Sequence, residues 1–94
     1  MQSRSDRIEA ILSRAFTPLL LKVVDDSRLH AGHAGARPEG ETHYTVLLIS
    51  ERFRGLSRVA RHRLVTEALS GEFAAGLHAL SLTLRTPEEQ RPPV

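Results

Sequence analysis

The first regular pattern of apolar residues along the chain is helical. Five apolar side chains recur at the i, i+3, i+4, i+7, i+8 spacing of an amphipathic helix, namely Ile8, Ile11, Leu12, Ala15 and Phe16. Ser3 or Ser5 can cap the N-terminus of this helix, and Pro18 marks its end because proline interrupts helical hydrogen bonding. The sequence therefore predicts an N-terminal helix that buries one face.

Two strands come next. Leu19–Asp25 is rich in leucine and valine, and Thr42–Ser50 combines β-branched and aromatic residues, which favour strands. Arg28–Glu41 connects them and carries two histidines, His30 and His33, among glycines and a proline. A loop this long in so small a domain is usually functional or disordered.

A second helix follows the second strand. After a turn at Glu51–Leu56, which can include a short helical piece, Ser57 offers an N-cap for a helix that runs to about Ala75. Its apolar arc consists of Leu64, Val65, Ala68, Leu69 and Phe73. Arg61 and Glu72 lie near the two ends of that arc, so we expect both to project past the edge of the core.

A third strand follows a glycine cap. Gly76 fits the C-cap of the helix, and the run from His78 alternates between two faces. The residues of this run that should face the core are Leu80, Leu82 and Leu84. His78 has the same parity, so we expect it to open the core-facing row at the first residue of the strand.

The order helix, strand, strand, helix, strand predicts an α+β fold with helices on one face of a three-stranded mixed sheet. The first two strands should be antiparallel, and the second and third parallel, because a right-handed helical crossover joins them. A chain of 94 residues is enough for one compact domain and too short for two. We expect a single domain over residues 1–94, with its core at about residues 6–87 and a frayed tail at residues 88–94.

Composition narrows the class of protein. Apolar residues make up 40% of the chain and charged residues 26%, which is typical of a globular protein rather than a disordered or membrane-embedded one. The apolar runs are too short to span a membrane, and the N-terminus lacks the pattern of a secretory signal, so we expect a cytoplasmic protein. The formal charge of +2 is weak evidence for a nucleic-acid partner.

Cysteine is absent from the chain, whereas histidine occurs five times. The chain therefore has no disulfide, no thiolate nucleophile and no Cys-based zinc site of its own, and metal chemistry must use His, Asp or Glu. Nucleophile elbow, phosphate loop and metalloprotease helix are also missing from the sequence. We expect a protein that works by binding rather than an enzyme.

Three sequence blocks together resemble the BolA family. They are, in order, Glu41–Val46 (ETHYTV), Phe53–Ser57 (FRGLS) followed by Arg61–Val65 (RHRLV), and His78–Leu82 (HALSL). The resemblance extends over nearly the whole chain and implies a fold similar to the class II KH domain. It also implies a monothiol glutaredoxin partner that shares a bridging [2Fe-2S] cluster, with mixed Cys and His ligation, in cluster trafficking or iron sensing. Some bacterial members are instead described as transcriptional regulators of cell shape and stress, so DNA binding is the alternative function.

The ligands of the family map onto histidines of this chain. The C-terminal ligand falls on His78, and the second ligand, in the loop between the first two strands, falls on His30 or His33. The match gives His30 when it is counted from Asp25 and His33 when it is counted back from His43. A [2Fe-2S] cluster needs four ligands, and imidazole can replace thiolate on one iron. A chain without cysteine must borrow thiolates from the glutaredoxin and its glutathione, so we expect no cluster when the protein is alone.

Each histidine also has a simpler interpretation. His78 can be an edge-of-core residue that hydrogen-bonds to backbone, and His30 and His33 can be solvated loop residues. We interpret His43, at the head of the second strand, as structural, and its neighbour Tyr44 as a packing residue.

Arg61, His62 and Arg63 form a second candidate site near the start of a helix. Arginine clusters and free backbone N–H groups favour an anion or phosphate there, and the resemblance implies acidic groups of a docked glutaredoxin. Alternatively, Arg61 pairs with an acidic neighbour, His62 borders the apolar face and Arg63 is solvated. Nucleic acid ranks second because the turn at Phe53–Arg58 has a single glycine instead of Gly-x-x-Gly and aromatic residues are only 4% of the chain. Alone, the protein should be a monomer or weak dimer.

Overall fold

A computed structural model of the chain describes residues 3–26 and 42–90. The elements are α1 (Arg4–Phe16), β1 (Leu20–Asp25), β2 (His43–Ile49), the 3-10 helix η2 (Glu51–Phe53), α2 (Arg58–Ala68), α3 (Ser70–Ala74) and β3 (Ala79–Arg85). The strands agree with the predicted ranges to within one residue at each end, and the short helical piece in the turn after β2 is confirmed. His30 and His33, with the rest of residues 27–41, lie outside the described residues. Among the described helices, none has the length and apolar character needed to cross a membrane.

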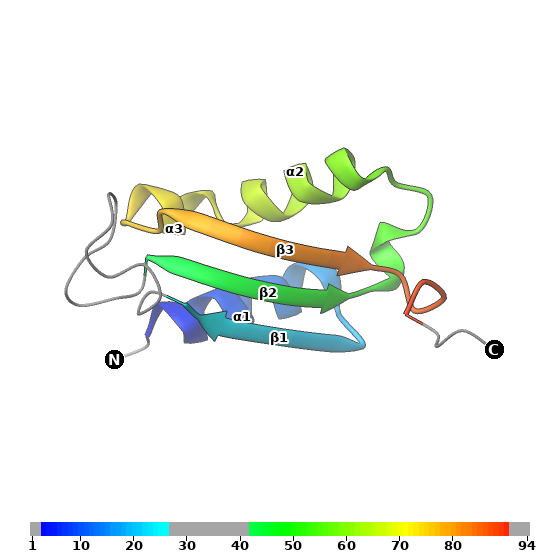
Figure 1. Ribbon diagram of the computed structural model, residues 1–94, viewed down its shortest axis with the longest axis horizontal. Coiled ribbons are helices and arrows are strands. Elements are labelled where there is room, and N and C mark those ends of the chain that lie inside the picture. Colours follow the sequence, from blue (N-terminus) through cyan, green and yellow to red (C-terminus); the bar gives the residue numbers. More distant parts are fainter. Residues whose placement is uncertain (1–2, 27–41, 91–94) are drawn as a thin grey trace.

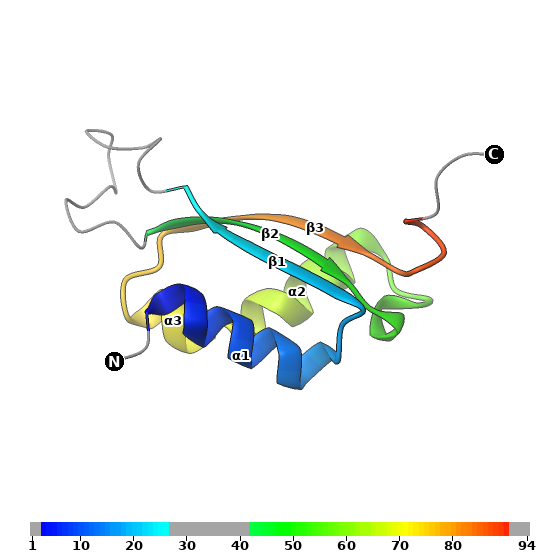
Figure 2. The same ribbon diagram turned by 90° about the horizontal axis from the view of Figure 1, so that it is seen from below.

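The three strands form one mixed sheet in the order β1-β2-β3, with β1 antiparallel and β3 parallel to the central strand β2. All helices lie on one face of this sheet (Figures 1 and 2). The predicted α+β fold and strand directions are therefore confirmed. No described helix covers the opposite face, where Leu20 and Val24 of β1 are 46% and 38% exposed.

The core lies between the sheet and the helices. On β2, Tyr44, Val46 and Leu48 are buried, and the parallel register places Leu80, Leu82 and Leu84 of β3 beside them. The helices, η2 and the residue between α2 and α3 contribute Ile8, Leu12, Phe16, Phe53, Val65 and Leu69 to the same cluster. The rings of Phe16 and Phe53 are 5.1 Å apart, which joins the end of α1 to the turn after β2. The predicted core-facing leucines are partly buried against this cluster.

The second predicted helix is divided into two. Leu69, with φ −97° and ψ 12°, leaves helical geometry between α2 and α3. Its carbonyl accepts hydrogen bonds from the N–H groups of Glu72 and Phe73, so α3 starts a new turn from it. Ser70 and Gly71 follow at once, and both are poor helix formers, which explains why a continuous helix to Ala75 was wrong.

The break directs Glu72 toward α1. Its carboxylate accepts hydrogen bonds from Arg4 Nε at 3.1 Å and from Arg7 Nε at 3.0 Å, and Arg4 also donates to the Ala75 carbonyl. The hydrogen bonds from Arg7, and those from Arg4, lower the pKa of Glu72. Glu72 and Arg61 are 7% and 8% exposed, so the expectation that both project past the core was wrong. Both are buried at its border because each has a partner of opposite charge.

Candidate functional site

His78 lies immediately before β3 and is exposed to solvent. It does not open the core-facing row of β3, contrary to the prediction from parity. The N–H groups of His78 and Ala79 both donate to the Thr42 carbonyl, at 2.8 and 3.1 Å, and regular strand alternation begins only at Ala79. Leu77, which is 4% exposed, fills the core at this end of the sheet instead.

The ring of His43 backs the ring of His78. The two ring centroids are 5.2 Å apart, and the ring planes are tilted by 52°. His43 is only 8% exposed, and its Nδ1 lies 2.9 Å from the Thr42 hydroxyl oxygen. The backbone of His43 is fixed from the other side, because its carbonyl accepts the N–H of Asp26 beyond β1. We call His43 and His78 the histidine pair.

Sequence reasoning treated His43 as a structural residue and missed its place beside His78. The parallel register pairs His43 with Ala79, so the heads of β2 and β3 stand next to each other. The prediction of parallel strands contained this signal, because two parallel strands begin at the same edge of a sheet. Tyr44, expected to pack, is 2% exposed in the core.

Metal-ligating groups are sparse in the described part of the chain. Residues 3–26 and 42–90 contain no cluster of three or more His, Asp or Glu side chains suited to a metal ion. The predicted ligands His30 and His33 lie outside these ranges, so the structure leaves them as a prediction. At the start of β3 the structure offers one exposed imidazole at a fixed backbone position, with a second imidazole packed against it.

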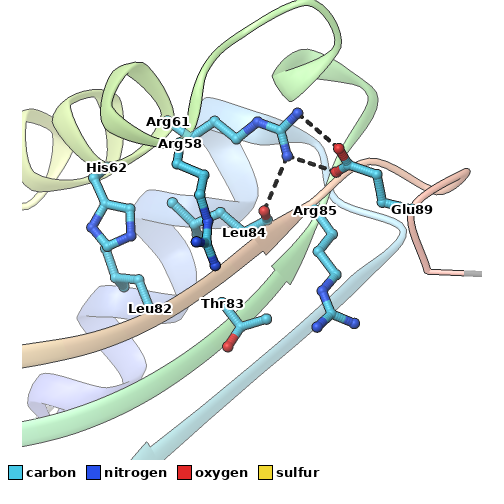
Figure 3. A pocket seen from close by; sticks show the side chains of 8 residues that line it. All are labelled: Arg58, Arg61, His62, Leu82, Thr83, Leu84, Arg85 and Glu89. Atoms are coloured by element: carbon cyan, nitrogen blue, oxygen red, sulfur yellow. Dashed lines mark hydrogen bonds and ion pairs between the residues drawn. The ribbon is translucent and has the colours of Figure 1, made fainter.

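A groove lies at the other end of β3, beside α2. It has a volume of about 610 Å³. Its lining residues are Arg58, Arg61, His62, Leu82, Thr83, Leu84, Arg85 and Glu89 (Figure 3). Three arginines and one histidine line the groove together with a single carboxylate, that of Glu89. The net charge of the groove is therefore positive.

Arg61 belongs to the framework of this groove. Its guanidinium donates to the carbonyls of Leu56 and Leu84 at 3.0 and 3.2 Å and to the carboxylate of Glu89 at 2.6 and 3.1 Å. Figure 3 shows its guanidinium directed toward Glu89 and the Leu84 carbonyl. Hydrogen bonds from Arg61, and one from the Thr86 N–H, lower the pKa of Glu89 to about 2. Of the interpretations for Arg61, pairing with an acidic neighbour is the one that the structure fits.

The other cations of the groove are more accessible. His62 is exposed and lines the groove, whereas Arg63 is exposed and does not. Arg58 and Arg85 also line it, and sequence reasoning missed both. Arg58 lies four residues before His62, so helical periodicity places the two on one side of α2 and was an available signal. No sequence signal pointed to Arg85, because only the fold brings the end of β3 next to α2.

The segment after β3 closes this end of the groove. Glu88 forms an ion pair with Arg54 at 2.9 Å, and Glu89 pairs with Arg61. The Glu89 carboxylate also accepts the N–H of Thr86, while the Glu89 N–H donates to the Thr86 hydroxyl. These contacts extend two residues beyond the core limit expected at residue 87, and residues 91–94 lie outside the described part.

These features define a class of small α+β domain, with KH-like element order, an exposed histidine at one end of the sheet and a cationic groove at the other. The family model described as "BolA-like protein" matches residues 12–89, and the chain belongs to this family. The solved structure of BolA1 from Arabidopsis thaliana is 41% identical and has a TM-score of 0.87, covering 97% of this chain and 99% of that one. The predicted family and fold are confirmed.

Two further relatives differ in what their names describe. SufE-like protein 1 of Arabidopsis thaliana is 44% identical over 93% of this chain, and the "DNA-binding transcriptional regulator BolA" of Vibrio cholerae is 44% identical over 89%. The chain spans 24% of the first protein and 76% of the second, and 57% of chloroplastic BOLA1 of Arabidopsis thaliana. The BolA domain is thus shared by proteins of different length and described role.

Proposed function

We propose that this protein is a non-enzymatic adaptor that binds a monothiol glutaredoxin and shares a [2Fe-2S] cluster with it in cluster trafficking or iron sensing. The observation that carries the proposal is His78, an exposed imidazole whose backbone is held by Thr42 and whose ring is backed by His43. An imidazole that projects from a fixed backbone position is suited to ligate a metal centre brought by a partner.

The histidines of this chain fit two of the four ligand positions of such a cluster. His78 would hold the cluster from this chain, together with His30 or His33 of the loop, and the glutaredoxin and its glutathione would supply thiolates. The bound cluster provides an iron pair that can be transferred or sensed. The chain contains no cysteine, so a partner is required for thiolate ligation, and the protein alone would hold no cluster. As part of this proposal, the protein acts in the cytoplasm and is a monomer or weak dimer without its partner.

The test compares histidines at the two ends of β3. The protein is mixed with a monothiol glutaredoxin, glutathione, iron and sulfide, and visible absorption and circular dichroism are compared with those of the glutaredoxin alone. We expect a distinct spectrum for the heterodimer, which His78→Ala alters or abolishes. His62→Ala is the matched control, because His62 is also exposed but lies in the groove. Absence of a complex, or an unchanged spectrum with His78→Ala, would contradict the proposal.

The same mixture identifies the second ligand. His30→Ala and His33→Ala are measured separately, and the variant that alters the spectrum carries the loop ligand. If neither variant changes the spectrum, the loop does not supply a ligand and the proposed ligand set is wrong.

DNA binding is the second candidate function, and one observation favours it. Arg58, His62 and Arg85 line a groove between a helix and an edge strand, where phosphates can meet several positive groups. The relative in Vibrio cholerae is named as a DNA-binding regulator, and we carry this over only as a proposal. Tight, sequence-selective binding at physiological salt would support it, whereas weak binding with a steep dependence on salt would reduce it to non-specific attraction.

A further inference from the structure

We infer that His43 is a positioning residue, which holds the ring of His78 in the orientation needed to ligate a metal centre. This inference rests on the proposed function, because it concerns the same ligand. It adds a residue that neither the resemblance nor the relatives assign: a buried imidazole that acts through His78 and does not itself need to touch the metal.

Hydrogen bonds hold the backbone on both sides of His78. Its own N–H and that of Ala79 donate to one acceptor, the Thr42 carbonyl. On the preceding side, the N–H of buried Leu77 donates to the Glu72 carbonyl at 2.9 Å. Residues 77–79 are therefore anchored both to α3 and to the residue that precedes β2, so most of the freedom left to His78 lies in its two side-chain torsions.

The side chain of His78 is restricted by a neighbouring ring. An exposed side chain samples several rotamers unless a neighbour restricts it, and a metal ligand loses that freedom on binding. The ring of His43, at 5.2 Å between centroids, is the neighbour that restricts the ring of His78. A ligand that is already ordered binds with a smaller entropic loss.

His43 is itself held in place by buried contacts. Its Nδ1 is hydrogen-bonded to Thr42 Oγ1, and its carbonyl accepts the N–H of Asp26. Thr42 and His43 are 1% and 8% exposed. The positioning ring is thus fixed by buried contacts, while the ring that it positions remains accessible. Outer residues that orient metal ligands through hydrogen bonds commonly contribute about 10- to 100-fold to metal affinity, and we expect the ring contact of His43 to act at the lower end of this range.

The experiment separates this inference from the ligation proposal. In the metal-free protein, carbon-13 relaxation of the His78 ring reports its motion on the picosecond to nanosecond scale, and no cluster is required. We expect an ordered ring in the unmodified protein, a mobile ring in His43→Ala, and an ordered ring again in His43→Phe, which restores a flat side chain at this position. Equal mobility in the unmodified protein and His43→Ala would overturn the inference.

A second readout uses the complex with glutaredoxin. The rate at which a chelator removes iron should rise about 10-fold in His43→Ala and return toward the original value in His43→Phe. If His43→Phe loses iron as fast as His43→Ala, ring packing is not the cause and the inference fails. Should His43→Ala not fold, as judged by its amide spectrum, His43→Asn keeps a hydrogen-bonding group without the ring and is expected to behave as His43→Ala does. If the His78 ring is ordered by His43 but His78→Ala leaves the cluster spectrum unchanged, then the ligation proposal alone is wrong.

Discussion

At the head of β3, where the strand begins, the exposed ring of His78 packs against the buried ring of His43. Ion pairs of Glu72 nearby join α3 to α1. At the tail of β3, Arg58 and Arg85 face a groove, and the buried Arg61 joins β3 to the segment that follows it. The head of the strand therefore presents one well-supported imidazole, whereas the tail presents several exposed positive charges. Fixed geometry suits coordination, which is directional, and a group of exposed charges suits attraction to an extended anion, which is not.

The two ends also differ in their ion pairs. Glu72, near the histidine pair, meets two arginines and its side chain is 9% exposed. Glu89, at the groove, meets Arg61 and its side chain is 46% exposed. A buried charge that loses its partner costs much more than an exposed one, so the first cluster should matter more for stability.

The largest effect is expected from Glu72→Ala. This change removes the carboxylate that pairs with the buried Arg4 guanidinium. Arg4 then keeps only its hydrogen bond to the Ala75 carbonyl among these two contacts. The free energy of unfolding should fall by about 3 kcal/mol, because a buried charge has lost its partner. Urea denaturation followed by circular dichroism measures it. Glu67→Ala is the control, because Glu67 is exposed and makes no ion pair within residues 3–26 and 42–90, and it should change stability by less than about 0.5 kcal/mol. Equal midpoints for the two variants would contradict the comparison.

The fold was largely predictable because its signals are local. Alternation in Leu80–Leu84 and the 3.6-residue period in Ile8–Phe16 survive in the structure, since both segments turn one face toward the core. The break at Leu69 was not predictable from the apolar arc alone. Its consequence, the contact of Glu72 with Arg4 and Arg7 of α1, joins residues 65 to 68 positions apart, and no local pattern in the sequence indicates it.

The candidate site was only partly predictable. His78 was identified from the family blocks, but its exposure was not, because parity fails where two N–H groups share one carbonyl. His43 and Arg85 acquire their roles from strands and helices that meet in space. Side chains that act together across elements leave no spacing pattern in the sequence.

The second prediction concerns the groove. Replacing both Arg58 and Arg85 with glutamine should weaken binding to a short double-stranded DNA about tenfold or more. It should also reduce the slope of log affinity against log salt by about 1 for each phosphate that the protein no longer neutralises. Fluorescence anisotropy at several salt concentrations measures both quantities. Arg63→Gln is the matched control, because Arg63 is exposed on the same helix but does not line the groove. If Arg63→Gln weakens binding as much as the double variant, the groove is not the anion site.

A smaller effect is expected at the histidine pair. Thr42→Val removes the hydroxyl that lies beside His43 Nδ1 while keeping the shape of the side chain, and should cost about 1 kcal/mol of stability. Thr66→Val is the control, because the Thr66 hydroxyl donates to carbonyls on the exposed surface of α2, where water can replace it. Thermal denaturation compares the two variants. Equal destabilisation would show that the buried support of His43 is no stronger than a surface contact.

The smallest effect is expected from Glu89→Gln, and its dependence on pH is the informative part. Arg61 retains the carbonyls of Leu56 and Leu84, so the loss of the exposed carboxylate should destabilise the protein only slightly at neutral pH. The pKa of Glu89 is lowered from its ordinary value of 4.5 to about 2 in the folded protein. A carboxyl group whose pKa is lowered by folding stabilises the protein above its unfolded pKa, and that contribution is lost as the pH falls toward the folded pKa.

The difference in urea midpoint between the unmodified protein and Glu89→Gln should therefore be constant above about pH 4.5 and vanish as the pH approaches 2. Glu72, whose pKa is also lowered, is present in both proteins, so its own protonation shifts both curves together and does not open a gap between them. A gap that persists at pH 2 would mean that Glu89 stabilises the tail of β3 through packing rather than through charge. In that case the segment that closes the groove would not act through charge, and the contrast between the two ends of β3 would not hold for this segment.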